Sequence, residues 1–361
     1  MLRPLDDVDL HARVQDCIDA ELAHQRDVLA EVGPEAADLV DAVATLLAGG
    51  KRLRASFVYW GYRAAGRPDS AALVRLASAM EFFQAAALIH DDVMDDSDIR
   101  RGQPAAHRAL AAHHVRRAWL GDAERFGVAG AILAGNLCLG WTEELYATSG
   151  LAAQDLMRGR PVFDRMRAQL MAGQFLDVVE SVRPHDALSV DERLARADQV
   201  IRYKSAKYTI EHPLLIGATV GGVAEPDLAL LSVYGLDLGH AFQLRDDLLG
   251  VFGDPVQTGK PAGDDLREGK RTVLVAHTVQ GATPGGRALL EGNLGRADLD
   301  DARVEELRAV ISGSGAVEAV ETQIARLAQS ARAALAATQG IDPVAREALD
   351  GLVESATARA S

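Results

Sequence analysis

Apolar residues recur every three or four positions along much of the chain, which is the spacing that one face of an α-helix requires. The clearest case is the segment 317–335, whose apolar positions are Val317, Val320, Ile324, Leu327, Ala331 and Leu335. The same spacing runs through the segments 72–90, 191–210 and 227–250. We find no convincing run of alternating apolar and polar residues that would indicate a strand, and no repeat of fixed period. The pattern therefore predicts an all-α fold.

Clusters of glycine and proline interrupt the helical segments and indicate the loops between them. They lie at 64–70, 182–187, 221–226, 254–265 and 283–286. No low-complexity linker divides the chain, so we expect a single domain, 1–361, built as a bundle of ten or more helices around a central cavity. We expect its motifs to lie in a core spanning 45–275 and the polar segment 283–361 to be a helical C-terminal extension.

Composition supports a helical, globular protein and limits its ligands. Only 5% of the residues are aromatic and alanine and leucine are abundant, which favours helices over sheets. The formal net charge of −14 argues against nucleic acid as a partner, because no basic excess exists to neutralise phosphates. An anionic ligand must therefore be held by a few well-placed cations or by metal ions.

No segment predicts a membrane span or a disulfide. The N-terminus is charged throughout, unlike a signal sequence or a membrane anchor. The most apolar stretch, 128–141, is too short to cross a bilayer and predicts a buried helix. Cys17 and Cys138 lie far apart in sequence, and we expect two reduced thiols. These features predict a soluble, cytoplasmic protein.

The segment 88–102, "LIHDDVMDDSDIRRG", places five aspartates within eight positions. On a helix, Asp91 and Asp95 lie one above the other, and Asp96 lies above Asp92. Like charges at this spacing destabilise a helix, so we expect a compensating positive charge. Aspartates are also common at solvated helix ends, and the cluster by itself is equally compatible with that structural role.

The surroundings of the cluster favour a metal site. The preceding residues 82–89 are apolar, so the aspartates lie at the end of a buried helix. Carboxylates in such a place suit Mg²⁺, which takes one or two carboxylates together with water and phosphate oxygens. Arg100 and Arg101 would then bind phosphate, because guanidinium groups match the geometry of phosphate oxygens.

The segment 242–272, "FQLRDDLLGVFGDPVQTGKPAGDDLREGKRT", repeats this arrangement later in the chain. Asp246 and Asp247 follow an apolar helix and precede the basic residues Lys260 and Lys270. Alone, the segment is typical of a surface helix and its loop. As a second aspartate pair, it predicts that two helix ends face each other across a cavity and hold a diphosphate through metal ions.

Two further segments carry basic residues that could bind an anion. The segment 48–57, "AGGKRLRASF", places Lys51, Arg52 and Arg54 at a helix start, where backbone amides favour anions. The segment 203–209, "YKSAKYT", adds Lys204 and two small hydroxyl groups. Taken singly, each is as readily explained as a solvated charged face.

Together these segments resemble the trans-isoprenyl diphosphate synthase (polyprenyl synthetase) family, the head-to-tail prenyltransferases that include geranylgeranyl and farnesyl diphosphate synthases. The matching segments, which also include "GQFLD" at 173–177, span 45–275 and form an ordered set that is far more specific than one DDxxD motif. The resemblance is greatest to bacterial geranylgeranyl diphosphate synthases. It implies the isoprenoid synthase fold, a homodimer, and condensation of isopentenyl diphosphate with dimethylallyl, geranyl or farnesyl diphosphate.

The resemblance also implies roles for individual residues. About three Mg²⁺ ions per active site would be held by the two aspartate motifs, whose members are Asp91, Asp92, Asp95, Asp246 and Asp247. The allylic diphosphate would be bound by Arg100, Lys204, Gln243 and Lys260, and Ser205 and Lys270 would be further substrate-binding residues. The diphosphate of isopentenyl diphosphate would be bound by Lys51, Arg54, Gln84 and Arg101. The catalytic set would be Asp91, Asp92, Asp95, Arg100, Lys204, Asp246 and Lys260.

The chain departs from the family pattern in the second aspartate motif. The fifth position of this DDxxD motif is Gly250, and the next acidic residue is Asp254. This departure leaves an outer contact of the third metal ion unassigned, although the pair Asp246 and Asp247 is intact. Ser205, where the family often has threonine, keeps the hydroxyl group.

The resemblance implies ionisation of the allylic diphosphate, attack by the double bond of isopentenyl diphosphate, and loss of a proton to the departing pyrophosphate. Apolar walls would keep water from the cation. One helical turn rises about 5.4 Å, close to one extended isoprene unit. One turn before Asp91 stand the small Ala86 and Ala87, and Phe83 and then Met80 lie deeper. If Phe83 acts as the floor of the cavity, the point beyond which the growing chain cannot extend, the product has twenty carbons. Phe83 could equally be an ordinary residue of the packed core.

Three alternatives are weighed against this interpretation. A class I terpene cyclase would not need the second diphosphate site that "GGKRLR" and "RRG" suggest. A non-catalytic partner subunit of a heteromeric synthase commonly loses an aspartate motif, and both pairs remain here. A Ca²⁺-binding structural protein would need a loop of spaced acidic ligands, which we do not find. A farnesyl or longer-chain synthase, with a product of C25 or more, remains an alternative within the family.

Overall fold

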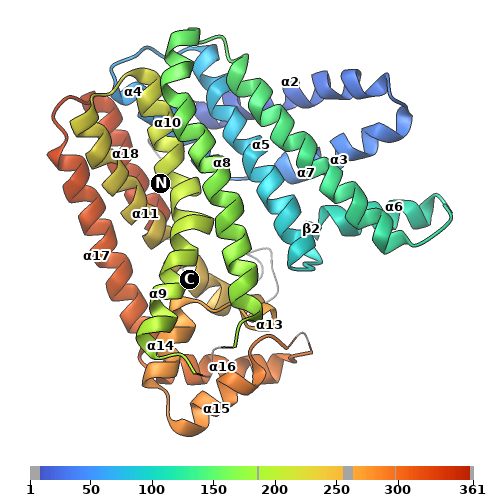
Figure 1. Ribbon diagram of the computed structural model, residues 1–361, viewed down its shortest axis with the longest axis vertical. Helices are drawn as coiled ribbons and strands as arrows, with labels where there is room; N and C mark the ends of the chain where they lie inside the picture. The colour runs from blue at the N-terminus through green and yellow to red at the C-terminus, as the bar shows by residue number, and fades with distance from the viewer. Residues whose placement is uncertain (1–8, 185–186, 255–262, 297, 358–361) are drawn as a thin grey trace. The chain divides into compact units, whose positions relative to one another are not determined.

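The computed structural model describes residues 9–184, 187–254, 263–296 and 298–357. These residues are almost entirely helical (Figure 1), so the all-α prediction of ten or more helices is confirmed. The helices up to Val182 are α2 (Leu10–Ala30), the short 3₁₀-helix η1 (Pro34–Ala36), α3 (Ala37–Leu47), α4 (Leu53–Ala64), α5 (Ala71–Met94), α6 (Ala106–Arg116), α7 (Ala123–Ala147) and α8 (Ala153–Val182). Those that follow are α9 (Val190–Val200), η2 (Ile201–Glu211), α10 (His212–Gly221), α11 (Glu225–Phe252), α13 (Asp264–Glu268), α14 (Val273–Gly281), α15 (Pro284–Asn293), α16 (Asp301–Gly313), α17 (Ala316–Ala337) and α18 (Pro343–Thr357).

The chain folds into two compact units, each assembled from separate stretches of sequence. Unit 1 comprises Met1–Pro161, Pro213–Ala224 and Gly340–Ala348. Unit 2 comprises Val162–His212, Glu225–Gln339 and Leu349–Ser361. This division does not follow the expected boundary between a core and a C-terminal extension, because the last segment contributes to both units. The single domain and its central cavity stay predictions.

Helix α5 is the central element of unit 1. It packs against α2, α4 and α7, and most of its residues are buried around the whole circumference. The helix begins where the Ser70 hydroxyl accepts a hydrogen bond from the Leu73 amide at 3.1 Å, satisfying one of the open donors of the first turn. It ends at Met94 because Asp96 adopts a left-handed backbone conformation, with φ of 53°.

Two glycines allow α4 and α10 of unit 1 to approach until their backbones touch. A Cβ atom on Gly61 would lie 2.2 Å from the Leu214 carbonyl oxygen. A Cβ atom on Gly217 would lie 1.9 Å from the Val58 carbonyl oxygen. No larger residue fits at either position without separating the helices. This contact fixes the helix that begins with Leu53, directly after the basic segment "GGKR".

Helix α11 is the corresponding element of unit 2. It packs against η2, α13 and α17, and its buried face joins the apolar core of that unit. At one point the Tyr234 hydroxyl donates to the Leu349 carbonyl oxygen at 2.7 Å. Near the end of the helix, both terminal nitrogens of Arg245 donate to the carboxylate of Glu321 on α17. These contacts hold the C-terminal part of α11, which carries the second aspartate pair.

The helix expected over 191–210 changes type within its length. Residues 190–200 form the α-helix α9, whereas η2, Ile201–Glu211, is a π-helix. The wider backbone of η2 is accommodated by glycines on its neighbours. A Cβ atom on Gly239 would lie 2.5 Å from the Ala206 carbonyl oxygen, and one on Gly173 would lie 2.5 Å from the backbone of Tyr203. Such widened turns are frequently found at functional sites, and η2 carries the whole "YKSAKYT" segment.

The apolar stretch 128–141 lies within α7, and the prediction of a buried helix is wrong for one of its faces. Ala134 and Cys138 are buried against α5, but Ile132 and Leu133 are exposed. By length and composition, α5 is the one described helix that could cross a membrane, yet 78% of its apolar window is buried inside the protein. Core helices of soluble proteins share this property. Cys17 and Cys138 are free thiols, as expected.

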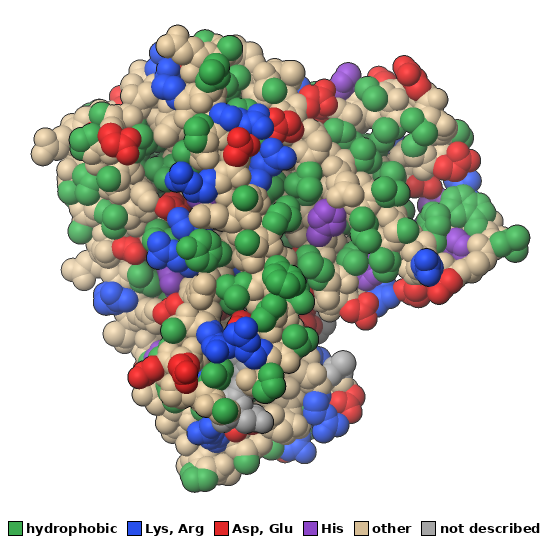
Figure 2. All heavy atoms as spheres, in the orientation of Figure 1, with side chains coloured by type: hydrophobic (Ala, Val, Ile, Leu, Met, Phe, Trp, Pro, Cys, Tyr) green, Lys and Arg blue, Asp and Glu red, His purple; other side chains and the backbone are tan. Residues whose placement is uncertain are grey.

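Basic and acidic side chains are interspersed on the face of the protein that Figure 2 shows. No large basic patch is visible there, which agrees with the net charge of −14.

The buried imidazole of His212 should make the fold sensitive to acid. Its side chain is buried, and this burial lowers the pKa of the imidazole to about 4. A histidine in the unfolded chain titrates near pH 6.5, so between the two values the unfolded chain binds a proton that the folded chain does not. The stability that the neutral His212 contributes is therefore present above pH 6.5 and is lost as the pH falls toward 4. From pH 7 to pH 5 this histidine alone should cost about 2 kcal/mol.

Urea unfolding at pH 7 and pH 5 tests this expectation. The difference in the free energy of unfolding between the two pH values should shrink by about 2 kcal/mol in the variant His212→Phe. The exposed His24 provides a control, and His24→Asn should keep the pH dependence of the parent. An equal pH dependence in His212→Phe and the parent would contradict the assignment.

Candidate active site

The end of α5 presents the first three predicted metal-binding carboxylates at different depths. Asp91 and Asp95 are one turn apart and partly exposed, whereas Asp92 is only 1% exposed. Asp95 caps the helix, and its amide donates to the Asp91 carbonyl oxygen at 2.8 Å. The stacking of Asp91 and Asp95 on one face is therefore as predicted.

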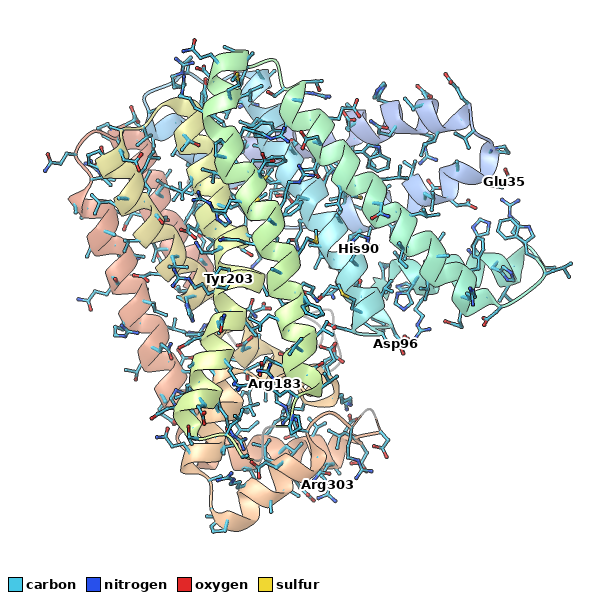
Figure 3. All side chains as sticks on the ribbon, in the orientation of Figure 1. Glu35, His90, Asp96, Arg183, Tyr203 and Arg303 are labelled. Atoms are coloured by element: carbon cyan, nitrogen blue, oxygen red, sulfur yellow. The ribbon has the colours of Figure 1, made fainter. Side chains whose placement is uncertain are left out.

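Asp96 does not lie above Asp92, which corrects the helical extrapolation from the sequence. The helix has ended at this position, and the left-handed conformation of Asp96 turns its side chain elsewhere. Figure 3 shows Asp96 where α5 ends, with His90 further back along the helix. The Asp96 carboxylate pairs with Arg108 of α6 at 2.9 Å.

Two arginines pair with different members of the aspartate cluster. Arg100 donates from Nε to Asp92 at 2.8 Å, also contacts Asp92 through a terminal nitrogen, and lies 3.6 Å from Asp91. Arg108 binds Asp96 and Asp98 on the exposed side. The expected compensating charge is present, but half of it comes from Arg108, which sequence reasoning missed. Its signal was weak, because Arg108 lies ten residues beyond the cluster.

A short hairpin brings Arg100 back to the end of α5. Strands β1 (Ile99–Arg100) and β2 (Gln103–Pro104) pair antiparallel around a two-residue turn. Both turn residues, Arg101 and Gly102, have positive φ, of 53° and 72°. This is the turn type that matches the twist of a hairpin. The "RRG" sequence thus directs two successive arginines to different partners.

Arg101 belongs to a group of cations before α4. Its guanidinium donates to the carbonyl oxygens of Leu46 and Gly49, at 2.8 and 2.5 Å. Desolvation lowers the pKa of this guanidinium, and nearby Arg52, Arg54 and Arg100 lower it further, against the opposing charge of Glu81. Arg101 thus lies near three other guanidinium groups, and an anion bound among them would be stabilised.

The other residues predicted to bind the diphosphate of isopentenyl diphosphate also belong to unit 1. Lys51 is exposed, Arg54 is partly buried, and Gln84 is buried within α5. Arg52, in contrast, is fully buried and bonded to Glu81, Gln15 and the Leu47 carbonyl oxygen. Arg52 therefore holds the start of α4 in place, which leaves its neighbours Lys51 and Arg54 as the candidate ligands.

The second aspartate pair lies near the end of α11 in unit 2. Asp246 is exposed and Asp247 is 5% exposed. The Gln243 amide donates to Asp247 at 2.8 Å. Burial raises the pKa of Asp247 to about 8, with further increases from Asp265 and Asp246, against lowering effects of Gln243 and Lys270. Burial and the neighbouring carboxylates together outweigh the effects of Gln243 and Lys270 on this pKa.

The two predicted lysines of unit 2 that the structure describes each pair with a carboxylate. Lys204, on the π-helix, donates to Asp177 of α8 at 2.6 Å, and its neighbour Ser205 is buried. Lys270 donates to Asp265 at 2.9 Å and contacts Glu268 at 2.7 Å. Asp177 stands in the "GQFLD" segment but was assigned no role from the sequence. Lys260 lies outside the described residues.

These donor sets fit a hard divalent cation that keeps several non-protein ligands. All the predicted ligands are carboxylates, which Mg²⁺ and Ca²⁺ prefer. Within the described ranges, no group of three or more acidic, histidine or cysteine side chains is close enough to hold a metal by itself. Mg²⁺ is usually bound by one or two carboxylates, with water and substrate phosphates completing its shell. The geometry within each unit is compatible with that arrangement.

The residues proposed to limit product length lie along α5, which is unbroken from Ala71 to Met94. Met80, Phe83 and Ala86 are buried, and Ala87 is partly buried. Phe83 is eight residues before Asp91 on the continuous helix, a rise of about 12 Å. Its neighbour Phe82 points to another face and meets Trp141 of α7 edge-on, with ring centroids 6.0 Å apart. The two adjacent phenylalanines are therefore separable by mutation.

Comparison with known proteins gives a consistent result over nearly the whole chain. The profile of the family described as polyprenyl synthetase matches residues 37–311. A geranylfarnesyl diphosphate synthase of Aeropyrum pernix is 31% identical, over 85% of this chain and 89% of that protein. A nonaprenyl diphosphate synthase of Mycobacterium tuberculosis is 29% identical, over 96% and 92%.

Among solved structures, a geranylgeranyl pyrophosphate synthase from Corynebacterium glutamicum, complexed with isoprenyl diphosphate and magnesium, superposes with a TM-score of 0.91. It is 39% identical, and the alignment covers all of both chains. A polyprenyl synthase from Caulobacter crescentus, complexed with calcium and isoprenyl diphosphate, superposes with a TM-score of 0.75 at 31% identity, over 97% of this chain and 98% of that one.

The ion pair of Arg100 with Asp92 predicts a large loss of stability when the arginine is removed. The variant Arg100→Met would leave the buried Asp92 carboxylate without its main counter-charge, which costs about 3–5 kcal/mol for a buried pair. Urea unfolding of the purified variant measures this loss.

Arg108 supplies the matched control. Its partners Asp96, Asp98 and Glu124 are mostly exposed, so Arg108→Met should cost less than about 1 kcal/mol. Equal losses in the two variants would show that burial of Asp92 does not govern the stability of this segment.

Proposed function

The chain belongs to the polyprenyl synthetase family and is a head-to-tail prenyltransferase, and on this premise we propose that it joins isopentenyl diphosphate to an allylic diphosphate to make geranylgeranyl diphosphate. The observation that carries the proposed product is the geometry of α5. Asp91 and Asp95 stand at its accessible end, the small Ala86 and Ala87 one turn before, and the large Phe83 a turn deeper.

We propose that the two aspartate motifs bind Mg²⁺, about three ions per active site as the family resemblance implies. The carboxylate-only donor sets and the excess negative charge around Asp247 support divalent cation binding. When bound, Mg²⁺ would supply the positive charge that stabilises the departing diphosphate. Asp91, Asp95 and Asp246, the more accessible carboxylates, would contact the ions, and the buried Asp92 and Asp247 would orient and support them.

The cations of unit 1 would hold the diphosphate of isopentenyl diphosphate. Arg54 is close enough to Arg101 to lower the pKa of its guanidinium, which favours an anion between the two, whereas Arg100 stays assigned to the allylic diphosphate. Lys51 is exposed beside this group and would add a further charge. In unit 2, Lys204, held by Asp177, and Lys270 would assist the allylic diphosphate.

The length of the product is the finer part of the proposal. The related enzymes have names that span geranylgeranyl, geranylfarnesyl and nonaprenyl products, so sequence similarity does not select one. The register of α5 favours twenty carbons, because about two helical turns separate Asp91 from the buried Phe83. A farnesyl product or one of C25 or more is the alternative outcome. The assembly as a homodimer stays a prediction.

Incubation of the purified chain with isopentenyl diphosphate, Mg²⁺ and each primer in turn tests the function. Dimethylallyl, geranyl and farnesyl diphosphate should each be extended to a product of the same length, and chelation of the metal should stop the reaction. Chromatographic sizing of the products measures the length. If the chain alone consumed no isopentenyl diphosphate with any primer, a non-catalytic partner subunit would be the better interpretation.

The floor assignment predicts that Phe83→Ala lengthens the product by at least one isoprene unit, because the tail gains room along α5. Phe82→Ala is the control. Both substitutions remove a buried ring and should destabilise the protein by about 3–5 kcal/mol. Only Phe83→Ala should change the product, since Phe82 packs on Trp141 of α7. An unchanged product length in Phe83→Ala would refute the assignment.

A further inference from the structure

Unit 2 has a surface pocket that none of the sites described above uses. It has a volume of about 370 Å³ and is lined by residues of three helices, α9, α14 and α17. Helix α14 packs against both of the other helices, so it forms the base of the pocket and they form its walls (Figure 1). The volume falls at the lower end of the range for small-molecule sites, about 300–1,000 Å³. A ligand of the pocket is therefore small.

The two charged residues of the pocket come from opposite walls. Asp198 belongs to α9 and Arg326 to α17. The Asp198 side chain is 45% exposed, and its Oδ1 accepts a hydrogen bond from His240 Nε2 at 3.0 Å, which leaves Oδ2 for a ligand. Arg326 is exposed, and within the described part of the chain its guanidinium has no hydrogen-bond or ion-pair partner, Asp198 included. The pocket thus presents two opposite charges that do not neutralise each other.

The surface between these charges is apolar. Val273 of α14 is 1% exposed and belongs to the apolar core of unit 2, against which Leu194 of α9 also packs. Ala319 lines the pocket from α17 and is partly buried. An aliphatic group that covers these three side chains removes apolar surface from water, which favours binding.

We propose that this pocket binds a small zwitterion, a molecule with an ammonium group, an acidic group and a short aliphatic body between them. The ammonium group pairs with Asp198 and the acidic group with Arg326, while the body lies over Val273. An exposed ion pair contributes little by itself, so both pairs are needed. A ligand with only one of the two charges leaves the other charge of the pocket without a partner and binds more weakly.

The walls of the pocket continue into helices that carry residues of the proposed active site. Helix α9 runs directly into η2, where Lys204 stands six residues after Asp198. His240, the partner of Asp198, stands six residues before Asp246 on α11. An ammonium group on Asp198 competes with His240 for the carboxylate and should loosen the link between α9 and α11. Resting on the proposed function, we expect an occupied pocket to weaken binding of a diphosphate with Mg²⁺.

Ligand-observed NMR titration of the full chain with 6-aminohexanoate tests the binding site. Hexanoate and hexylamine, which have the same number of carbons and one charge each, are the controls and should bind about fivefold more weakly or worse. Leucine, whose charges are close together, distinguishes an α-amino acid from a ligand with separated charges. Binding of neither zwitterion would overturn the proposal, as would hexanoate or hexylamine binding as tightly as the better zwitterion.

Two variants locate the binding in this pocket. Arg326→Gln and Asp198→Asn should each raise the dissociation constant of the bound zwitterion about fivefold, the effect of losing one exposed ion pair. Arg332→Gln is the matched control, because Arg332 lies on the same helix but pairs with Asp350, outside the pocket. It should bind the zwitterion as the parent does. Unchanged binding in Arg326→Gln, or an equal loss in Arg332→Gln, would overturn the assignment.

Titration with Mg²⁺ and inorganic pyrophosphate, followed by the melting temperature, tests the coupling without turnover. A saturating concentration of the bound zwitterion should raise the half-saturating pyrophosphate concentration about fivefold, and pyrophosphate should weaken zwitterion binding by the same factor. An unchanged concentration would overturn the coupling. A chain that binds the zwitterion but neither binds pyrophosphate with Mg²⁺ nor condenses the substrates would overturn the proposed function and leave the zwitterion site standing.

Discussion

Carboxylates gathered at the buried ends of two helices impose the main constraint on this structure. A buried charge is tolerated only when an opposite charge or several hydrogen bonds offset its lost hydration. At the end of α5, the charge of Arg100 offsets that of Asp92, and a two-residue turn places Arg100 beside it. At the end of α11, Gln243 and Lys270 offset Asp247 only in part, and burial keeps its pKa near 8. Compensation of charge is therefore less complete at the end of α11 than at the end of α5.

Close approach of helix backbones positions the cations beside α4 in unit 1 and Lys204 in unit 2. Gly61 and Gly217 let α4 and α10 touch in unit 1, which sets the start of α4 and the cations beside it. Gly173 and Gly239 make room for the π-helix of unit 2, which carries Lys204. Gly250 makes room for a carboxylate instead of a backbone. In each case the absence of a side chain on one helix determines where a charged group on another element can lie.

The charged groups around the two aspartate motifs therefore come from different distances along the chain. The first relies on residues close in sequence, since Asp91, Asp92, Asp95 and Arg100 fall within ten positions. The second combines Asp246 and Asp247 with groups from the segment after α11, in which Asp265 and Lys270 are coupled to each other.

Helix content, the apolar face of each long helix and the two aspartate pairs were determined by the sequence itself, because the helical period and local motifs depend on neighbours within about one or two turns. The left-handed end of α5, the widening of η2 and the exposed face of α7 were not, because each depends on contacts with distant segments. The partners of Asp96 and Gly250 likewise lie in other elements, α6 and α13. Only tertiary structure decides them, since periodicity places a side chain on a face but does not say what meets it there.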